Sequence, residues 1–178
     1  MATQVPLLIE ERNGQWVLSG HMMRKQDHTT ALENDPHVLV VFTGPHAYVS
    51  ASWYTNQQQA STWNYQSVHA KGKISFVDQD MLEIQLQKLS SFFEKDPVGS
   101  PTVFKNLPAD YKEPLLKAIV GFEIQVEQID HVFKLSQNRD KESFQHIIHK
   151  LQEQGGEAAA VALEMEKYRE RRENENAI

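Results

Sequence analysis

The stretch Val120–Val126 alternates between apolar and polar or small residues without a break. A period of two places alternate side chains on opposite faces of a strand, so one face is apolar and the other is hydrated. The pattern predicts a half-buried antiparallel strand, which needs partner strands at its edges and an apolar layer over one face. The apolar face consists of Val120, Phe122, Ile124 and Val126.

Further strand patterns lie on both sides of this stretch. Val5–Ile9 and Gln15–Ser19 flank Asn13-Gly14, a pair that tolerates positive φ and therefore predicts a hairpin. The other expected strands are His37–Phe42, buried throughout, then His46–Ser50 after a turn at Gly44-Pro45, Thr62–Val77 with a bulge or bend at Gly72, and His131–Leu135.

Helical spacing of apolar residues appears in segments between and after the strands. The expected helices are Arg24–Asn34, Asp80–Lys95 with Asp80 as cap, Ala109–Lys117, the stretch after Asn138 or Asp140 with one of these as cap, and Glu157–Arg172. The predicted fold class is therefore mainly β with α (α+β). Six or more antiparallel strands would form a small β-barrel with inserted helices and a C-terminal helical tail.

Composition narrows the classes of function. The 178 residues carry a formal net charge of −6, which argues against a broad basic surface and so against direct DNA binding. The absence of cysteine excludes disulfides and thiolate metal sites, and fits a cytoplasmic protein. No apolar run reaches membrane-spanning length, and the first residues lack a secretory signal.

Two neighbouring segments, "GPHAYVSASWY" (Gly44–Tyr54) and "STWNY" (Ser61–Tyr65), combine tryptophans and tyrosines with hydroxyl and amide residues. Aromatic rings usually serve a core, whereas buried hydroxyl and amide groups need partners. The mixture fits a site for a flat ligand with polar edges. It fits equally an ordinary strand pair with one hydrated face, and composition leaves both interpretations open.

Other candidate motifs are less specific. "KLSQNRD" (Lys134–Asp140) offers positive charge and hydrogen-bond donors to a phosphate, but it also fits a polar turn from strand to helix, which spacing alone favours slightly. His146 and His149 lie opposite an apolar helical stripe, so we expect them to face water, and no metal site is predicted. The chain has no G-x-S-x-G, P-loop or G-x-G-x-x-G motif, and no catalytic residue is assigned.

Four stretches together carry a resemblance that covers most of the chain: "GPHAYVSASWY", "STWNYQSVHAKGKISFV", "LLKAIVGFEIQVEQI" and "KLSQNR". In this order and spacing they closely resemble the PaiB-like family of FMN-binding negative transcriptional regulators. The resemblance implies an FMN-binding split β-barrel and a homodimer with flavin sites at the dimer interface. It implies a split-barrel domain over residues 1–139, without the family's N-terminal helix and strand, and a helical tail over 140–178 packed on the barrel.

The resemblance also implies which residues form the flavin pocket. Aromatic side chains would pack on the faces of the isoalloxazine ring, and hydroxyl and amide groups would contact its edge. A second segment, from either subunit, would close the pocket. The implied FMN-binding residues are Ser50, Ser52, Trp53, Thr62, Trp63, Asn64, Tyr65, Lys134, Ser136, Gln137, Asn138 and Arg139.

Three hypotheses for function follow. The first is an FMN-binding regulator of the PaiB type that acts negatively on transcription through the flavin or a protein partner, since no recognition helix for DNA is evident. The second is an FMN-dependent oxidoreductase, in which the flavin supplies the redox chemistry. The third is a family member that keeps the dimer and has lost its ligand.

Overall fold

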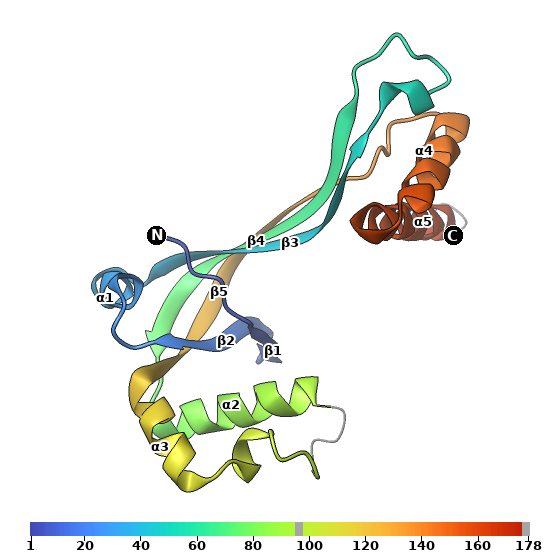
Figure 1. Cartoon of the computed structure of the whole chain (residues 1–178). Helices are drawn as coiled ribbons and strands as arrows, with labels where there is room; N and C mark the ends of the chain where they lie inside the picture. Colours follow the sequence, from blue (N-terminus) through green and yellow to red (C-terminus); the bar gives the residue numbers. More distant parts are fainter. Residues whose placement is uncertain (95–97, 176–178) are drawn as a thin grey trace. The chain divides into compact units, whose positions relative to one another are not determined.

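The computed structural model describes residues 1–94 and 98–175 (Figure 1). The chain divides into two compact units. Unit 1 contains Met1–Val40 and the described part of Ala70–Ile129, and unit 2 contains Val41–His69 and the described residues from Asp130 onward. Each unit therefore combines two segments that are separated in the sequence.

One five-stranded sheet is present in the described residues, with the order β1-β2-β5-β4-β3. The pairs β1–β2 and β2–β5 are antiparallel, and β3, β4 and β5 contribute residues to both units. The strands are β1 (Leu8–Arg12), β2 (Gln15–Met23), β3 (His37–Val49), β4 (Thr62–Phe76) and β5 (Ile119–Lys134).

The described helices confirm the predicted mixture of strands and helices. Two short 3₁₀ turns, η1 (Ala51–Trp53) and η2 (Phe104–Asn106), accompany the α-helices. The α-helices are α1 (Asp27–Asn34), α2 (Gln79–Phe93), α3 (Ala109–Ala118), α4 (Lys141–Gln154) and α5 (Gly156–Glu175). Lys95, the last residue of the expected second helix, lies outside the described residues.

The predicted hairpin at Asn13-Gly14 is confirmed. Both residues have positive φ, 54° and 79°, which is the conformation that a two-residue hairpin turn requires. The turn pairs Arg12 with Gln15 and sets the register of β1 against β2. On the next strand, the predicted alternation of Val120–Val126 is also confirmed, because all four of its apolar side chains are buried.

Several predictions were wrong. His37–Phe42 is not buried throughout, since Leu39 and Val41 of β3 are exposed, and the sheet of the described residues has five strands and not six or more. The predicted turn at Gly44-Pro45 does not occur, because β3 runs through both residues as one strand with alternating burial. Proline is tolerated there because β3 is the last strand of the sheet, where a missing N–H need not break a ladder. The segment His131–Leu135 is not a separate strand, since its first four residues continue β5. The N-cap of α2 is Asp78, whose carboxylate accepts a hydrogen bond from the Met81 amide at 2.9 Å, and not Asp80.

Helices cover an apolar cluster in unit 1. Leu82 of α2, Phe104 of η2 and Leu116 of α3 are buried against one another, and Ile119 at the start of β5 packs on them. Burial of such side chains contributes about 1.5–3 kcal/mol each, so this small cluster is enough to hold the helices together.

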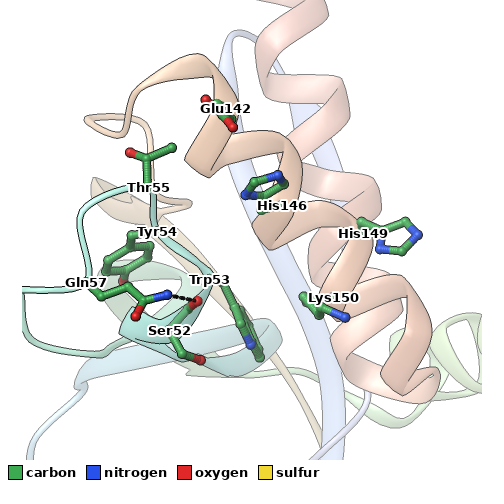
Figure 2. Close-up of a pocket in the computed structure, with 9 residues that line it drawn as sticks. All are labelled: Ser52, Trp53, Tyr54, Thr55, Gln57, Glu142, His146, His149 and Lys150. Atoms are coloured by element: carbon green, nitrogen blue, oxygen red, sulfur yellow. Dashed lines mark hydrogen bonds between the residues drawn. The ribbon is translucent and has the colours of Figure 1, made fainter.

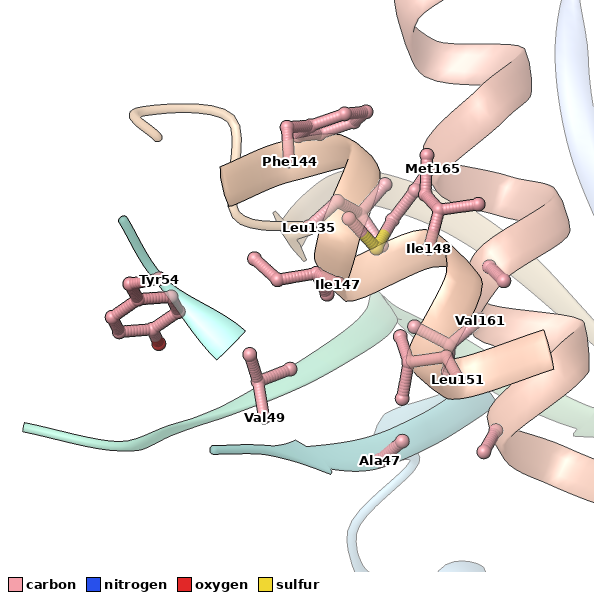
Figure 3. Packing of buried hydrophobic residues seen from close by; sticks show 12 residues of the cluster. Ala47, Val49, Tyr54, Leu135, Phe144, Ile147, Ile148, Leu151, Val161 and Met165 are labelled. Carbon is pink, nitrogen blue, oxygen red and sulfur yellow. The ribbon is translucent and has the colours of Figure 1, made fainter. Parts of the chain in front are cut away.

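Unit 2 has its own core, formed where α4 and α5 pack on β3 (Figure 3). α4 begins at Asp140, whose carboxylate accepts a hydrogen bond from the Ser143 amide at 2.9 Å, so Asp140 and not Asn138 is the cap. Gly155, with φ of 70°, ends the helix and lets α5 turn back. The buried residues are Ala47, Val49, Tyr54, Leu135, Phe144, Ile147, Ile148, Leu151, Ala158, Val161, Ala162 and Met165.

Candidate functional site

All twelve residues that the sequence assigns to the flavin site lie in unit 2. They come from the turn around η1, the start of β4 and the segment that joins β5 to α4. The last of these segments begins 69 residues after Tyr65, and all three are gathered in one compact unit. Some of these twelve residues are exposed at the surface, whereas others are buried in the core.

Trp63 is the centre of an exposed aromatic surface. It is 46% exposed and lies at the start of β4. The His46 ring lies with its centroid 5.6 Å from the Trp63 ring, and the Tyr48 ring lies edge-on at 6.3 Å. We call Trp63, His46 and Tyr48 the aromatic surface. Sequence reasoning did not assign His46 and Tyr48 to the site, although their spacing of two on β3 places them on one face.

The serines of η1 serve first to shape the turn. The Ser50 hydroxyl accepts a hydrogen bond from the Ser52 amide at 3.2 Å, and the two hydroxyl oxygens lie 2.8 Å apart. The Ser61 hydroxyl, in turn, accepts from the Ala51 amide at 3.0 Å. Such local side-chain bonds to backbone are the usual reason that serine is frequent in turns. Ser50 and Ser52 are therefore held in place by hydrogen bonds within the chain itself.

Asn64 and Ser136 lie in the core and not on the surface. Asn64 is fully buried, and its side-chain oxygen accepts a hydrogen bond from the Ser136 hydroxyl at 3.0 Å. The Asn64 amide group donates to the sulfur of Met165 on α5 at 3.4 Å. Buried polar groups require such partners. These two residues thus fix the segment after β5 against β4 and α5, and they influence a surface site through that backbone.

Arg139 is engaged within the chain. Its guanidinium lies 3.9 Å from the centre of the Tyr54 ring, and it donates a hydrogen bond to the side-chain oxygen of Gln59. Gln137 is also engaged, since its side-chain oxygen accepts from the Leu135 amide at 2.8 Å. These contacts favour the interpretation of Lys134–Asp140 as a polar turn. Lys134 and Asn138 are exposed, whereas Thr62 and Tyr65 are half-buried.

A pocket of about 490 Å³ lies between the η1 turn and α4 (Figure 2). Only Ser52 and Trp53 of its lining were assigned to a site from the sequence. The helix side was missed, although its residues 142, 146, 149 and 150 recur at helical spacing on one polar face. The exposure of His146 and His149 to solvent was predicted correctly. The lining consists of Ser52, Trp53, Tyr54, Thr55, Gln57, Glu142, His146, His149 and Lys150.

Hydrogen bonds hold the two walls of this pocket together. The Thr55 amide donates to the Ser143 hydroxyl at 2.9 Å, and the Thr55 hydroxyl donates to the Asp140 carboxylate at 3.2 Å. Hydrogen bonds from Ser143 to Asp140 hold the pKa of that carboxyl below its ordinary value, so it remains charged as an acceptor. The pocket is therefore a fixed feature of unit 2.

Residues 1–94 and 98–175, which the structure describes, contain neither a metal cluster nor a membrane-spanning helix. No group of three or more histidine, aspartate or glutamate side chains is placed to hold a metal ion there. No helix among these residues is long and apolar enough to cross a membrane.

Comparison with known proteins gives the family. Residues 1–128 match the family described as "Putative FMN-binding domain". The chain is 37% identical over 165 residues to protease synthase and sporulation protein PAI 2 of Bacillus subtilis, a match that covers 93% of this chain and 79% of that protein. An uncharacterized protein of Emericella nidulans is 32% identical over 151 residues, which cover 68% of this chain and 60% of that protein.

The matches among solved structures are more distant. The FAD and heme binding protein of Mycobacterium smegmatis matches with a TM-score of 0.47 and 15% identity, over 73% of this chain and 66% of that chain. The flavocytochrome Anf3 of Azotobacter vinelandii matches with a TM-score of 0.46 and 17% identity, over 79% of this chain and 60% of that chain. The sequence matches decide the assignment: this chain belongs to the PaiB family of FMN-binding-domain proteins, the family predicted from its motifs.

Proposed function

We propose that this chain is an FMN-binding regulator of the PaiB type, which acts negatively on transcription in the cytoplasm. The observation that carries the proposal is the exposed ring of Trp63, flanked by His46 and Tyr48, within the residues that match the FMN-binding family. A large aromatic group that remains exposed beside other rings is suited to stack on a flat ligand.

The residues around Trp63 suit the isoalloxazine ring of a flavin. The faces of that ring are apolar, and its edge carries carbonyl oxygens and ring nitrogens that hydroxyl and amide groups can contact. We assign the ring face to Trp63 and the ring edge to Thr62, Tyr65 and Ser50. FMN, when bound, supplies the redox chemistry, and the protein residues bind and orient it.

The phosphate of FMN needs a cation, and the segment after β5 offers two. Arg139 is already held by Tyr54 and Gln59, whereas the Lys134 side chain is exposed. We therefore assign the phosphate to Lys134, with Asn138 and Gln137 beside it in sequence. Arg139, Asn64 and Ser136 position this segment, and Trp53 supports the η1 turn from the core.

A second copy of the chain is the proposed partner. Val132 and Phe133 are consecutive residues of β5, so their side chains point to opposite faces of the strand. They are 48% and 39% exposed, so apolar groups face solvent on both faces. A homodimer that covers this part of β5 would bury both groups and complete a flavin site from two chains.

Regulation is proposed to be indirect. The net charge of −6 does not support a surface that binds the phosphates of DNA. A change in flavin redox state, or a protein partner that binds the dimer, would then carry the signal.

Titration of FMN tests the flavin proposal. Two tryptophans of nearly equal exposure make a matched pair, because Trp63 is 46% exposed and Trp16, in unit 1, is 45% exposed. Trp63→Ala should weaken FMN binding by about threefold to tenfold through loss of the stacking surface, and Trp16→Ala should leave it unchanged. If FMN fluorescence is not quenched at saturating protein, or both variants behave alike, the proposed site is wrong.

Two further measurements separate the remaining alternatives. Consumption of NAD(P)H with added FMN, beyond the rate of free FMN, would establish the oxidoreductase instead. Sedimentation at micromolar concentration should show a dimer, and Phe133→Lys should shift it to monomer because a charge would be buried in the interface. A wild-type chain that is monomeric at that concentration would contradict the two-chain site.

A further inference from the structure

The pocket between the η1 turn and α4 has basic side chains on one wall and an aromatic ring on the other. Its helix wall presents the Lys150 ammonium and the imidazoles of His146 and His149, and its opposite wall includes the Trp53 indole (Figure 2). Its volume of about 490 Å³ falls within the usual range for small-molecule sites, which is roughly 300–1,000 Å³. The helix wall lies beyond residue 128, where the match to the FMN-binding family ends.

We propose that this pocket is a second binding site, which takes a small aromatic carboxylate. The proposal stands on the pocket's own residues and does not depend on flavin binding. A planar ring would lie against Trp53, and the carboxylate would lie beside Lys150 and His149. The polar groups of Gln57 and Thr55 complete the wall on the side of the turn.

The charges along α4 place the anion at one end of the pocket. Glu142 and Lys150 both line it, eight residues apart, which is about 12 Å along a helix axis. The acidic group is therefore about two turns from Lys150 and His149 and does not neutralise them. A ligand carboxylate would be attracted to the end where Lys150 and His149 lie.

One acidic group does contact that basic end. Glu153 lies 2.8 Å from the Lys150 ammonium and 3.3 Å from His149, at the next turn of the same helix. The hydrogen bond from Lys150 lowers the pKa of the Glu153 carboxyl from its ordinary value. Glu153 does not line the pocket, and half of its side chain is exposed. It orients the two basic groups, and a ligand carboxylate can bind them from the pocket side.

The aromatic wall supplies the second half of the recognition. Trp53 is partly buried and packs on the core of unit 2, so its orientation is fixed. The Gln57 amide donates to the Ser52 carbonyl at 3.2 Å, which braces the turn that carries Trp53. A ring that stacks on an ordered indole gains contact without the cost of ordering it. This favours an aromatic anion over inorganic phosphate or an aliphatic acid.

The test uses benzoate as the probe, with the full-length chain and ligand-detected NMR at concentrations up to about 10 mM. Benzamide has the ring without the charge, and cyclohexanecarboxylate has the charge without the aromatic ring. We expect benzoate to bind and both analogues to bind at least about threefold more weakly. Absence of benzoate binding, or equal binding of either analogue, overturns the proposal.

Variants place the binding in this pocket. Lys150→Gln should weaken benzoate binding by about threefold to fivefold, which is the effect of an exposed ion pair. Lys141→Gln removes an exposed lysine of the same helix that does not line the pocket, and it should have no effect. Both side chains are on the surface, so both variants should fold. Equal effects of the two variants contradict the proposed site.

Competition with FMN separates this proposal from the flavin proposal. Benzoate binding should be unchanged at saturating FMN, and FMN binding should be unchanged in Lys150→Gln. If FMN displaces benzoate, the pocket is part of the flavin site and the second site does not exist. If FMN fails to bind while benzoate binds in this pocket, the flavin proposal alone fails.

Discussion

Asn64 and Ser136, 72 residues apart in sequence, are joined in the interior of unit 2 by a hydrogen bond of 3.0 Å from the Ser136 hydroxyl to the Asn64 side-chain oxygen. Ser136 also has a φ of 59°, the left-handed conformation that only glycine adopts without cost. The hydrogen bond is thus made by a residue whose backbone is itself unfavourable. It fixes the turn that precedes Arg139 and α4.

Ser136→Ala should destabilise the chain by about 1–3 kcal/mol, because the buried oxygen of Asn64 loses its partner while the unfavourable φ remains. Ser136→Gly loses the same hydrogen bond but relieves the backbone, so it should cost about 1 kcal/mol less than the alanine variant. Urea denaturation measures both. Equal stability of the two variants would show that the backbone of Ser136 carries no strain.

Arg139→Ala should weaken FMN and riboflavin to the same extent, because Arg139 holds the turn through Tyr54 and Gln59 and is not assigned to the phosphate. Loss of the contact with the Tyr54 ring should also cost about 0.5–1 kcal/mol of stability. Lys134→Gln is the matched comparison, and it should weaken FMN by about fivefold and riboflavin hardly at all. Fluorescence titration with both flavins measures these affinities. If Arg139→Ala weakens the binding of FMN and not that of riboflavin, Arg139 and not Lys134 binds the phosphate.

Tyr54→Phe should stabilise the chain. The Tyr54 hydroxyl is buried and has no hydrogen-bond partner among the residues that the structure describes. Removing an unsatisfied buried hydroxyl while keeping the ring should raise the free energy of unfolding by about 1 kcal/mol. Tyr48→Phe, at a side chain that is 52% exposed, should change it by less than about 0.5 kcal/mol. A loss of stability in Tyr54→Phe would mean that the hydroxyl has a partner.

Stability should fall as the pH drops below the ordinary pKa of histidine, because of His21. Burial lowers the pKa of this side chain from 6.5, so in that range the unfolded chain binds a proton that the folded chain does not. The contribution of neutral His21 to the free energy of unfolding is complete above pH 6.5 and is lost as the pH falls below that value. His21→Gln should flatten the dependence of unfolding free energy on pH below pH 6.5. If the slope is the same in His21→Gln as in the unmodified chain, burial of this imidazole does not set the pH dependence.

Gly72→Ala should destabilise unit 1 by at least about 2–3 kcal/mol. A Cβ atom at this position of β4 would overlap the backbone carbonyl of Gln125 on β5, and backbone atoms cannot move aside as a side chain can. Ser75→Ala, at an exposed position of the same strand, should be nearly neutral. A thermal melt of the two variants checks this. Similar melting temperatures would show that the strands can separate at this point.

The sequence by itself determined the features that short-range patterns encode. The alternation of Val120–Val126, the Asn13-Gly14 turn and the apolar spacing of α4 predicted elements that the structure contains, and the four family motifs predicted the family. These predictions succeeded because the period of apolar residues and the φ preference of turn residues act within a few neighbouring residues.

Tertiary structure decided which of those residues are exposed and which are buried. Asn64 and Ser136 are residue types that are common in binding sites. Each is nevertheless buried and hydrogen-bonded to a partner more than 70 residues away. Pro45 is a residue type that is typical of turns, but its position on an edge strand lets β3 continue. Whether a polar group is paired inside or left for a ligand depends on which segments meet in space. That choice comes from long-range packing, which local pattern cannot express.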